Sequence, residues 1–183
     1  NTSEQYYFSV NEKDPKPKLI QKREKGIIYS VNSWDGNFYM HTNKNAEDFK
    51  IEKTNDVNFK KWETYIPAKD ETLIGGITFL KNWQIRSEIT NALGKIFIKN
   101  LEENKEEELI FSEEKVFDGG VSLVQKDKDT DLIHISYSTP KTQSRVYLYN
   151  LKTKEKKLVK EQIIPSGHNP NDYIVERLEC LSH

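Results

Sequence analysis

The stretch IGGITFL (residues 74–80) decides the fold, because its apolar pattern returns along the chain at a nearly constant distance. Matching stretches are GIIYSV at residues 26–31 and VSLVQK at residues 121–126. Between corresponding apolar positions the spacings are 46 and 47 residues. A period of this length indicates stacked copies of one supersecondary unit, because a lone unit of that size cannot bury its apolar side chains.

Three further apolar patterns recur in a fixed order around the first, at spacings of 43 to 50 positions. The second set comprises residues 37–43, 82–90 and 131–138, in which Tyr39, Ile85 and Ile135 are expected to correspond; the third comprises 5–10, 48–53, 95–100 and 145–150; the fourth comprises 17–22, 63–68, 107–112 and 157–162. The members alternate apolar with polar residues and are separated by polar turns, a pattern typical of strands. No long window sustains the apolar periodicity of a helix.

Four strands in each unit of about 47 residues predict an all-β fold of the β-propeller type, in which each unit is one blade. The predicted organisation is a half-blade of two strands (1–24), three four-stranded blades (25–70, 71–118 and 119–164), and a linker with the first strand of a further domain (165–183). The chain would then be a fragment of a propeller. The charge runs LEENKEEELI and LKTKEKKLV are placed on hairpins, where water solvates them.

The composition fits a core that is divided among small units. Hydrophobic residues make up 35% of the chain and charged residues 31%, and the mean hydropathy is -0.81. The formal net charge of -1 provides no long-range field to gather nucleic acid or an anionic membrane. The single cysteine, Cys180, excludes an internal disulfide and fits a reducing compartment, so a cytoplasmic location is expected. No apolar run is long enough to span a bilayer.

Two common propeller signatures do not fit. The WD repeat places Trp-Asp at the end of the third strand of a blade, whereas Trp34 and Asp35 lie between the first and second strands and do not recur. The Asp-box of sialidase-type propellers requires a different glycine spacing from that of Ser33, Asp35 and Gly36.

A third resemblance covers the chain from end to end. Its elements are a Thr-Asn-x-x-Ala-x-x-Phe run (Thr42, Asn43, Ala46, Phe49), a Tyr-Ser-x-Pro element (Tyr137 to Pro140), and a closing Tyr-x-x-Glu-Arg-Leu (Tyr173, Glu176, Arg177, Leu178). In order and spacing these resemble the second half of the propeller in the prolyl oligopeptidase family of serine peptidases, in particular its oligopeptidase B (protease II) branch. The resemblance implies that the chain is a fragment of a seven-bladed propeller.

The resemblance implies a role and partners. In that family the propeller covers an α/β-hydrolase domain with a Ser, Asp, His triad and excludes folded proteins, so that only short peptides reach the serine. The oligopeptidase B branch cleaves after Lys or Arg. The implied partners are the hydrolase domain of the parent chain and, through it, peptide substrates. The closing motif of the family is followed by that hydrolase domain, whereas this sequence stops at His183.

The sequence predicts no catalytic, cofactor-binding or metal-binding residue. Its nearest approach to Gly-x-Ser-x-Gly, residues 120–124, has Val124 in place of the second glycine. The histidines are His41, His134, His168 and His183, and no pair of them has the spacing of metal ligands. Ser33, Asp35 and His41 match a triad by residue type only.

The strand aromatics are assigned to the core between blades rather than to a platform that stacks bases. They are Tyr6, Tyr7, Phe8, Phe38, Tyr39, Phe97, Tyr147 and Tyr149.

Two functional hypotheses follow. In the first, the chain is the non-catalytic, gating part of a serine oligopeptidase of the kind just described. In the second, it is a free-standing propeller that binds other proteins and has no hydrolase domain. Under either hypothesis a partial propeller is expected to self-associate through its end blades or through the strand predicted at residues 173–182, because exposed apolar faces and strand edges find partners.

Overall fold

A computed structural model describes residues 2–110, 118–123 and 128–180, and for residues 118–123 it describes the backbone alone. In these ranges the elements are strands, apart from a short 3-10 helix, η1 (Pro170–Asp172). The strands are β1 (Tyr6–Tyr7), β2 (Lys18–Leu19), β3 (Tyr29–Trp34), β4 (Asn37–Thr42), β5 (Lys50–Thr54), β6 (Glu63–Ile66), β7 (Thr72–Leu80), β8 (Trp83–Thr90), β9 (Leu93–Asn100), β10 (Lys105–Glu108), β11 (Asp118–Leu123), β12 (Leu132–Ser138), β13 (Arg145–Asn150) and β14 (Lys156–Glu161).

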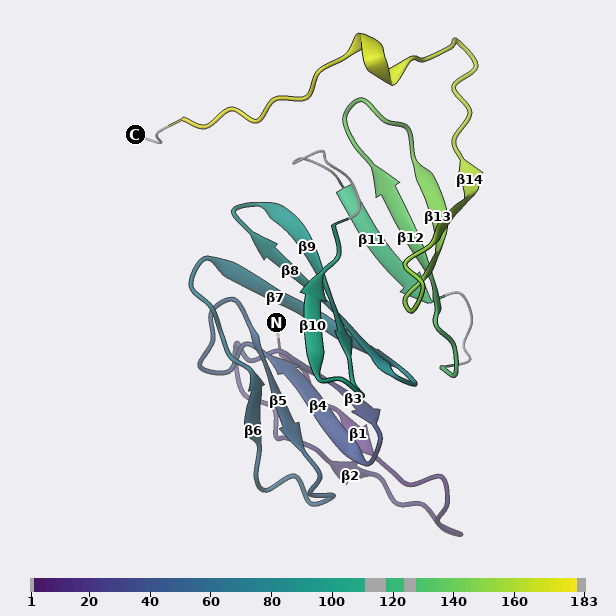
Figure 1. Cartoon of the computed structure of the whole chain (residues 1–183). Coiled ribbons are helices and arrows are strands. Elements are labelled where there is room, and N and C mark those ends of the chain that lie inside the picture. Colours follow the sequence, from purple (N-terminus) through teal and green to yellow (C-terminus); the bar gives the residue numbers. More distant parts are fainter. Residues whose placement is uncertain (1, 111–117, 124–127, 181–183) are drawn as a thin grey trace. The chain divides into compact units, whose positions relative to one another are not determined.

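Sheet order follows chain order throughout. Within the described residues there are three four-stranded sheets, β3 to β6, β7 to β10 and β11 to β14, and one two-stranded sheet, β1-β2 (Figure 1). Each four-stranded sheet is therefore a meander, the arrangement of a propeller blade. The fold is a partial β-propeller, and the all-β prediction is confirmed.

Tight turns make these meanders possible. Between β3 and β4 the turn residues Asp35 and Gly36 have φ angles of 46° and 70°, and between β8 and β9 Asn91 and Ala92 have φ angles of 51° and 57°. Positive φ at both central residues defines a type I′ turn, whose twist matches that of antiparallel strands.

Contacts within the chain divide it into two compact units, residues 1–77 with 86–91, and residues 78–85 with 92–183. In the first unit Tyr7, Phe38 and Phe59 pack edge to face, with ring centroids 5.0 to 5.8 Å apart. Ile51 and Ile74 are fully buried there. The aromatic side chains predicted to form the core therefore do so in part, since Tyr6 and Phe8 remain about half exposed.

The core of the second unit joins two sheets. Leu80, Trp83, Ile85, Ile98 and Leu109 come from the β7 to β10 sheet and its end, and they pack against a set from the β11 to β14 sheet. That set comprises Ile133, Ile135, Tyr137, Tyr149 and Leu151. These two sheets thus cover each other's apolar faces, as expected for stacked repeats that cannot bury their faces alone.

The predicted alignment of the repeats is wrong by one residue in the second strand. Ile85 and Ile135 were expected to correspond, but Ile85 packs toward the following sheet and Ile135 toward the preceding one. Because side chains alternate between the faces of a strand, a shift of one position exchanges the faces. The counterpart of Ile85 on β12 is therefore His134.

Three predicted strands also differ from those observed. The fourth strand of the second blade was expected at residues 107–112, whereas β10 ends at Glu108 and Ile110 is 74% exposed. β11 begins earlier than the predicted 121–126, and residues 124–127 lie outside the described ranges. From Tyr173 to Cys180 the chain is assigned to no strand, because a strand requires a hydrogen-bonded neighbour.

The position predicted for the acidic run also differs from the one observed. The acidic run LEENKEEELI was placed on a hairpin, yet four of its ten residues form β10 itself. The boundaries proposed for the blades, and the assignment of residues 165–183 to a linker and a further domain, stay predictions.

The one helix in the described ranges, η1, is three residues long, so none there could cross a membrane.

Candidate functional site

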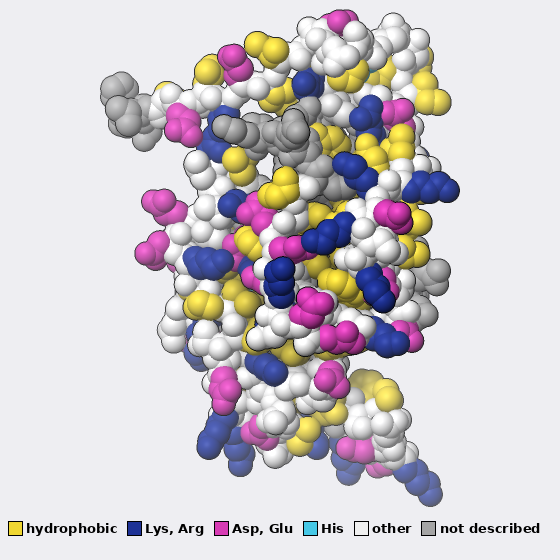
Figure 2. All heavy atoms as spheres, viewed as in Figure 1, with side chains coloured by type: hydrophobic (Ala, Val, Ile, Leu, Met, Phe, Trp, Pro, Cys, Tyr) yellow, Lys and Arg dark blue, Asp and Glu magenta, His cyan; other side chains and the backbone are white. Residues whose placement is uncertain are grey.

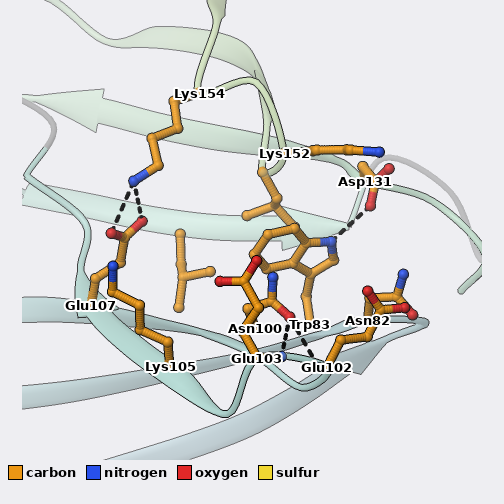
Figure 3. Close-up of a pocket in the computed structure, with 12 residues that line it drawn as sticks. Asn82, Trp83, Asn100, Glu102, Glu103, Lys105, Glu107, Asp131, Lys152 and Lys154 are labelled. Atoms are coloured by element: carbon orange, nitrogen blue, oxygen red, sulfur yellow. Dashed lines mark hydrogen bonds and ion pairs between the residues drawn. The ribbon is translucent and has the colours of Figure 1, made fainter.

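A pocket of about 320 Å³ opens in the second unit, between the turns that join the last two strands of its two sheets (Figure 3). Its floor is formed by Trp83, Ile98 and Leu151, all of which are at least nine-tenths buried. Its rim carries the charged side chains of Glu102, Glu103, Lys105, Glu107, Asp131, Lys152 and Lys154. The pocket therefore combines an apolar floor with a rim of mixed charge.

Two polar contacts hold the pocket walls together. The indole Nε1 of Trp83 donates a hydrogen bond to the carboxylate of Asp131 at 2.7 Å, which joins β8 to the segment before β12. The ammonium of Lys154 lies 2.6 Å from a carboxylate oxygen of Glu107, and this hydrogen bond raises the pKa of Lys154. Both contacts connect one sheet to the next.

The two turns that flank the pocket are stabilised in the same way, each by the side chain of its own asparagine. The side-chain oxygen of Asn100 accepts the backbone N–H groups of Glu102 and Glu103 at 3.0 and 3.1 Å. The side-chain oxygen of Asn150 accepts those of Lys152 and Thr153, both at 2.9 Å. Asparagine in this position stabilises a tight turn through its own side chain, so the rim residues are held on rigid backbone.

The pocket chemistry is that of binding. Its lining consists of carboxylates, ammonium groups, amides and apolar side chains, and in the described part of the chain no Ser, Cys or His belongs to it. Acyl transfer requires a nucleophile with a base in hydrogen-bond reach. A search of the described residues also finds no group of three or more His, Cys, Asp or Glu side chains arranged for a metal ion.

A row of buried polar side chains lies on β8 of the β7 to β10 sheet. Gln84, Arg86 and Glu88 alternate along one face and are 1%, 2% and 3% exposed. The Arg86 guanidinium and the Lys69 ammonium both contact the same carboxylate oxygen of Glu88, the latter at 2.6 Å. The corresponding face of β4 carries Phe38, Met40 and Thr42, and that of β12 carries Ile133, Ile135 and Tyr137.

This polar row departs from the pattern of its neighbours. Burying charged groups is unfavourable unless they are paired, and such pairs often contribute specificity more than stability. The sequence reasoning missed the row, although NWQIRSEIT signals it: polar residues stand at alternate positions where the other blades have apolar ones. Aligning the blades by their turns rather than by their apolar residues would have revealed it.

The histidines have structural contacts. The Nε2 of His41 lies 2.7 Å from the carbonyl oxygen of Ile74 in β7, and its ring stacks on Phe49 at 4.5 Å. Because a carbonyl only accepts, the proton of His41 is on Nε2. His168 makes a similar contact with the carbonyl of Lys141 at 2.6 Å, and His183 lies outside the described residues.

The residues that match a triad by type do not form one. Ser33 pairs across the hairpin with Phe38, whereas His41 pairs with Ser30. Three residues along a strand separate these pairs by about 10 Å. Of the Gly120-to-Val124 stretch, the first four positions belong to β11 as regular backbone and Val124 lies outside the described ranges.

Backbone N–H groups on the edge strands β3 and β7, each the first strand of its sheet, also have hydrogen-bond partners outside their sheets. On β3, the backbone N–H of Tyr29 donates to the Ser3 hydroxyl at 2.6 Å, and the N–H of Val31 donates to the Gln5 side chain at 2.7 Å. On β7, the N–H of Ile74 donates to the carbonyl of Asp48 at 2.8 Å. An unpaired strand edge requires such partners.

The comparisons with known proteins agree with this architecture. Meandering four-stranded sheets that stack through their faces define part of a β-propeller domain. Residues 1–162 match the family described as prolyl oligopeptidase, N-terminal beta-propeller domain. The chain therefore belongs to the prolyl oligopeptidase family, as part of its propeller domain.

Individual relatives are more distant. The chain is similar to oligopeptidase B from Trypanosoma brucei, solved in a closed form with covalently bound antipain, with a TM-score of 0.83 and 24% identity over 94% of this chain and 26% of that one. The structure of oligopeptidase B from Leishmania major gives a TM-score of 0.79 and 17% identity, over 96% and 26% respectively.

A curated relative, a dipeptidyl aminopeptidase BI of Pseudoxanthomonas mexicana, is 23% identical over 163 residues, which cover 87% of this chain and 22% of that protein. The chain thus spans about a quarter of the length of the relatives it matches.

Proposed function

We propose that the chain is the non-catalytic propeller portion of a serine oligopeptidase of the oligopeptidase B type, whose hydrolase domain cleaves short peptides after Lys or Arg. The match of residues 1–162 to the propeller domain of the prolyl oligopeptidase family carries this proposal. The role proposed for the chain is to restrict access to the hydrolase site by substrate size. We also propose a cytoplasmic location, since a single cysteine fits a reducing compartment.

A size filter must be stiff, and contacts between successive sheets support this. His41 bonds to the backbone of β7, and the Asn32 side-chain amide donates to the carbonyl of Ile77 at 3.3 Å. Trp83 and Asp131 join the next pair of sheets through a hydrogen bond between their side chains. These contacts resist separation of the sheets, because opening would leave the carbonyl groups of the buried residues Ile74 and Ile77 and the indole N–H of the buried Trp83 without partners.

Peptide hydrolysis tests the proposal. The 183-residue chain and the whole polypeptide that contains it would be assayed on short esters and peptides with Lys or Arg before the scissile bond. We expect turnover with the whole polypeptide, loss of turnover with a serine-directed inhibitor, and none with the chain alone. A folded protein with the same cleavage sites should be cut far more slowly than a peptide.

Other outcomes would redirect the assignment. Cleavage of dipeptides from a free N-terminus, with no preference for Lys or Arg, would move the protein to another branch of the family. A whole polypeptide without any peptidase activity would favour the free-standing, protein-binding propeller. Inhibitor-sensitive activity in the chain alone would refute a non-catalytic role.

A further inference from the structure

The outermost strands of the second unit carry opposite charges. Residues 102–108, which include β10, contain five Glu and one Lys and have a formal charge of −4. Residues 152–160, which include most of β14, contain five Lys and one Glu and have a formal charge of +4. The two segments occupy the same position in successive sheets, since each comprises a turn and the fourth strand.

Both strands are accessible along their length. Every residue of β10 and of β14 is exposed, and each strand stands last in the order of its sheet. No further strand lies on the outer side of either one in the described part of the chain. An outer edge of this kind presents backbone donors and acceptors that another strand can pair with.

Single-sign charge on an edge determines which edges can meet. Two β10 edges repel each other, and so do two β14 edges, because like charges that face each other across strands are destabilising. A β10 edge and a β14 edge attract. Uniform lysines on both edges would prevent all three pairings, which is the usual protection of exposed edges. This chain leaves one pairing favourable.

Within one copy, only some of the charged side chains of residues 102–108 and 152–160 form ion pairs with each other. Lys154 pairs with Glu107, while Glu108 lies 3.5 Å from Lys95 of its own sheet. Lys157 and Lys160 on β14 have no ion pair among the described residues. Counted together with Lys95 and Lys154, residues 102–108 keep a formal charge of −2, and residues 152–160 counted with Glu107 keep +3, so opposite charges remain on the two segments for a second molecule.

We propose that two copies of this chain associate through their outer strands, with β10 of one copy against β14 of the other. The contact is electrostatic and is limited to the four residues of β10. It is independent of the peptidase assignment, because it uses only strands on the outer side of the sheets. A single contact of this type is heterologous, so it closes into a dimer or extends into longer assemblies depending on geometry.

Sedimentation velocity and light scattering on the 183-residue chain test the proposal. At about 0.1 M salt, where the Debye length is about 10 Å, the average mass should rise with concentration above the 21.5 kDa of one chain. At about 1 M salt, where the Debye length is about 3 Å, it should return to one chain.

Two double variants identify the edges. Glu106→Lys with Glu108→Lys neutralises the acidic edge, and Lys157→Glu with Lys160→Glu neutralises the basic edge. Each variant alone should remain a single chain, whereas an equimolar mixture should form a dimer of one copy of each. The mixture has this effect because one variant keeps the +4 edge and the other keeps the −4 edge.

A matched control separates edge charge from net charge. Lys22→Glu with Lys25→Glu changes the net charge as much as the β14 variant but lies outside both charged segments, so it should associate as the original chain does. Circular dichroism would confirm that all variants are folded. A single-chain mass at every concentration overturns the proposal, as does association that is insensitive to salt or to both edge variants.

Discussion

Replacing Gly75 with Ala should destabilise the protein, whereas the same change at Gly76 should not. A Cβ atom at Gly75 would lie 2.8 Å from the backbone carbonyl oxygen of Ser87 on the paired strand and would also overlap the Ser87 hydroxyl. At Gly76 an added Cβ meets nothing within 4 Å. Neither residue has a positive φ, so the two positions differ in space rather than in backbone conformation.

The magnitudes follow from these distances. Relieving a contact with backbone requires the strands to move apart, and overpacking of this kind costs about 1–3 kcal/mol. Replacing Gly with Ala where the native conformation permits it gains about 0.4–1 kcal/mol through the unfolded state. We therefore expect a loss of about 1–2 kcal/mol for Gly75→Ala and a small gain for Gly76→Ala.

Urea unfolding of both variants and the original chain measures the difference. Adding Ser87→Gly to Gly75→Ala removes the hydroxyl but not the carbonyl, so it should restore only part of the lost stability. Equal stabilities of the two alanine variants, or full recovery with Ser87→Gly, would refute the reasoning from backbone contact.

Two further predictions concern buried charge and alkaline pH. Glu88→Ala should lower the free energy of unfolding by about 3–5 kcal/mol, because it leaves the buried Arg86 without its carboxylate. The double variant Arg86→Met with Glu88→Thr introduces the residues found at the corresponding positions of β4, and in urea unfolding it should recover most of the lost stability. A double variant no more stable than Glu88→Ala would contradict the pairing. Burial raises the pKa of Tyr39 and Tyr149 above 10.0, so the fold favours their neutral form. Their contribution to stability is complete below the unfolded pKa of about 10 and is lost as pH rises through the raised folded pKa. The urea midpoint should therefore fall as the pH rises above about 10, and it should fall less steeply with pH in the double variant Tyr39→Phe with Tyr149→Phe. The same dependence of the midpoint on pH in the double variant and the original chain would refute this.

The fold could be predicted because repeated units carry their signal several times. The first three strands of the sheets carry buried apolar residues wherever their side chains are described, so these residues recur and mark the strand positions. The fourth strand is the last in the order of its sheet; β14 lies within one residue of its predicted position, whereas β10 contains no apolar residue and is exposed throughout, so apolar spacing does not locate it. For that reason the prediction placed the fourth strand of the second blade too late in the sequence.

The candidate site could not be predicted, because it depends on contacts between distant segments. Trp83 and Asp131 are 48 residues apart and meet only when two sheets stack. The polar row on β8 has the alternation of a half-exposed strand, so the sequence shows the polar residues but not that they are buried. Local sequence determines each blade, whereas the pocket and the buried charges come from the way blades pack.

The reading frame that encodes this chain tests the central claim most directly. If the chain is the propeller portion of a serine oligopeptidase, the frame should continue past the closing Tyr173-to-Leu178 motif into a domain with Gly-x-Ser-x-Gly followed by Asp and His. Serine-directed labelling of the product should then modify that serine and no residue of the chain described above. A stop codon soon after the motif would contradict the claim and leave a propeller that acts by binding alone.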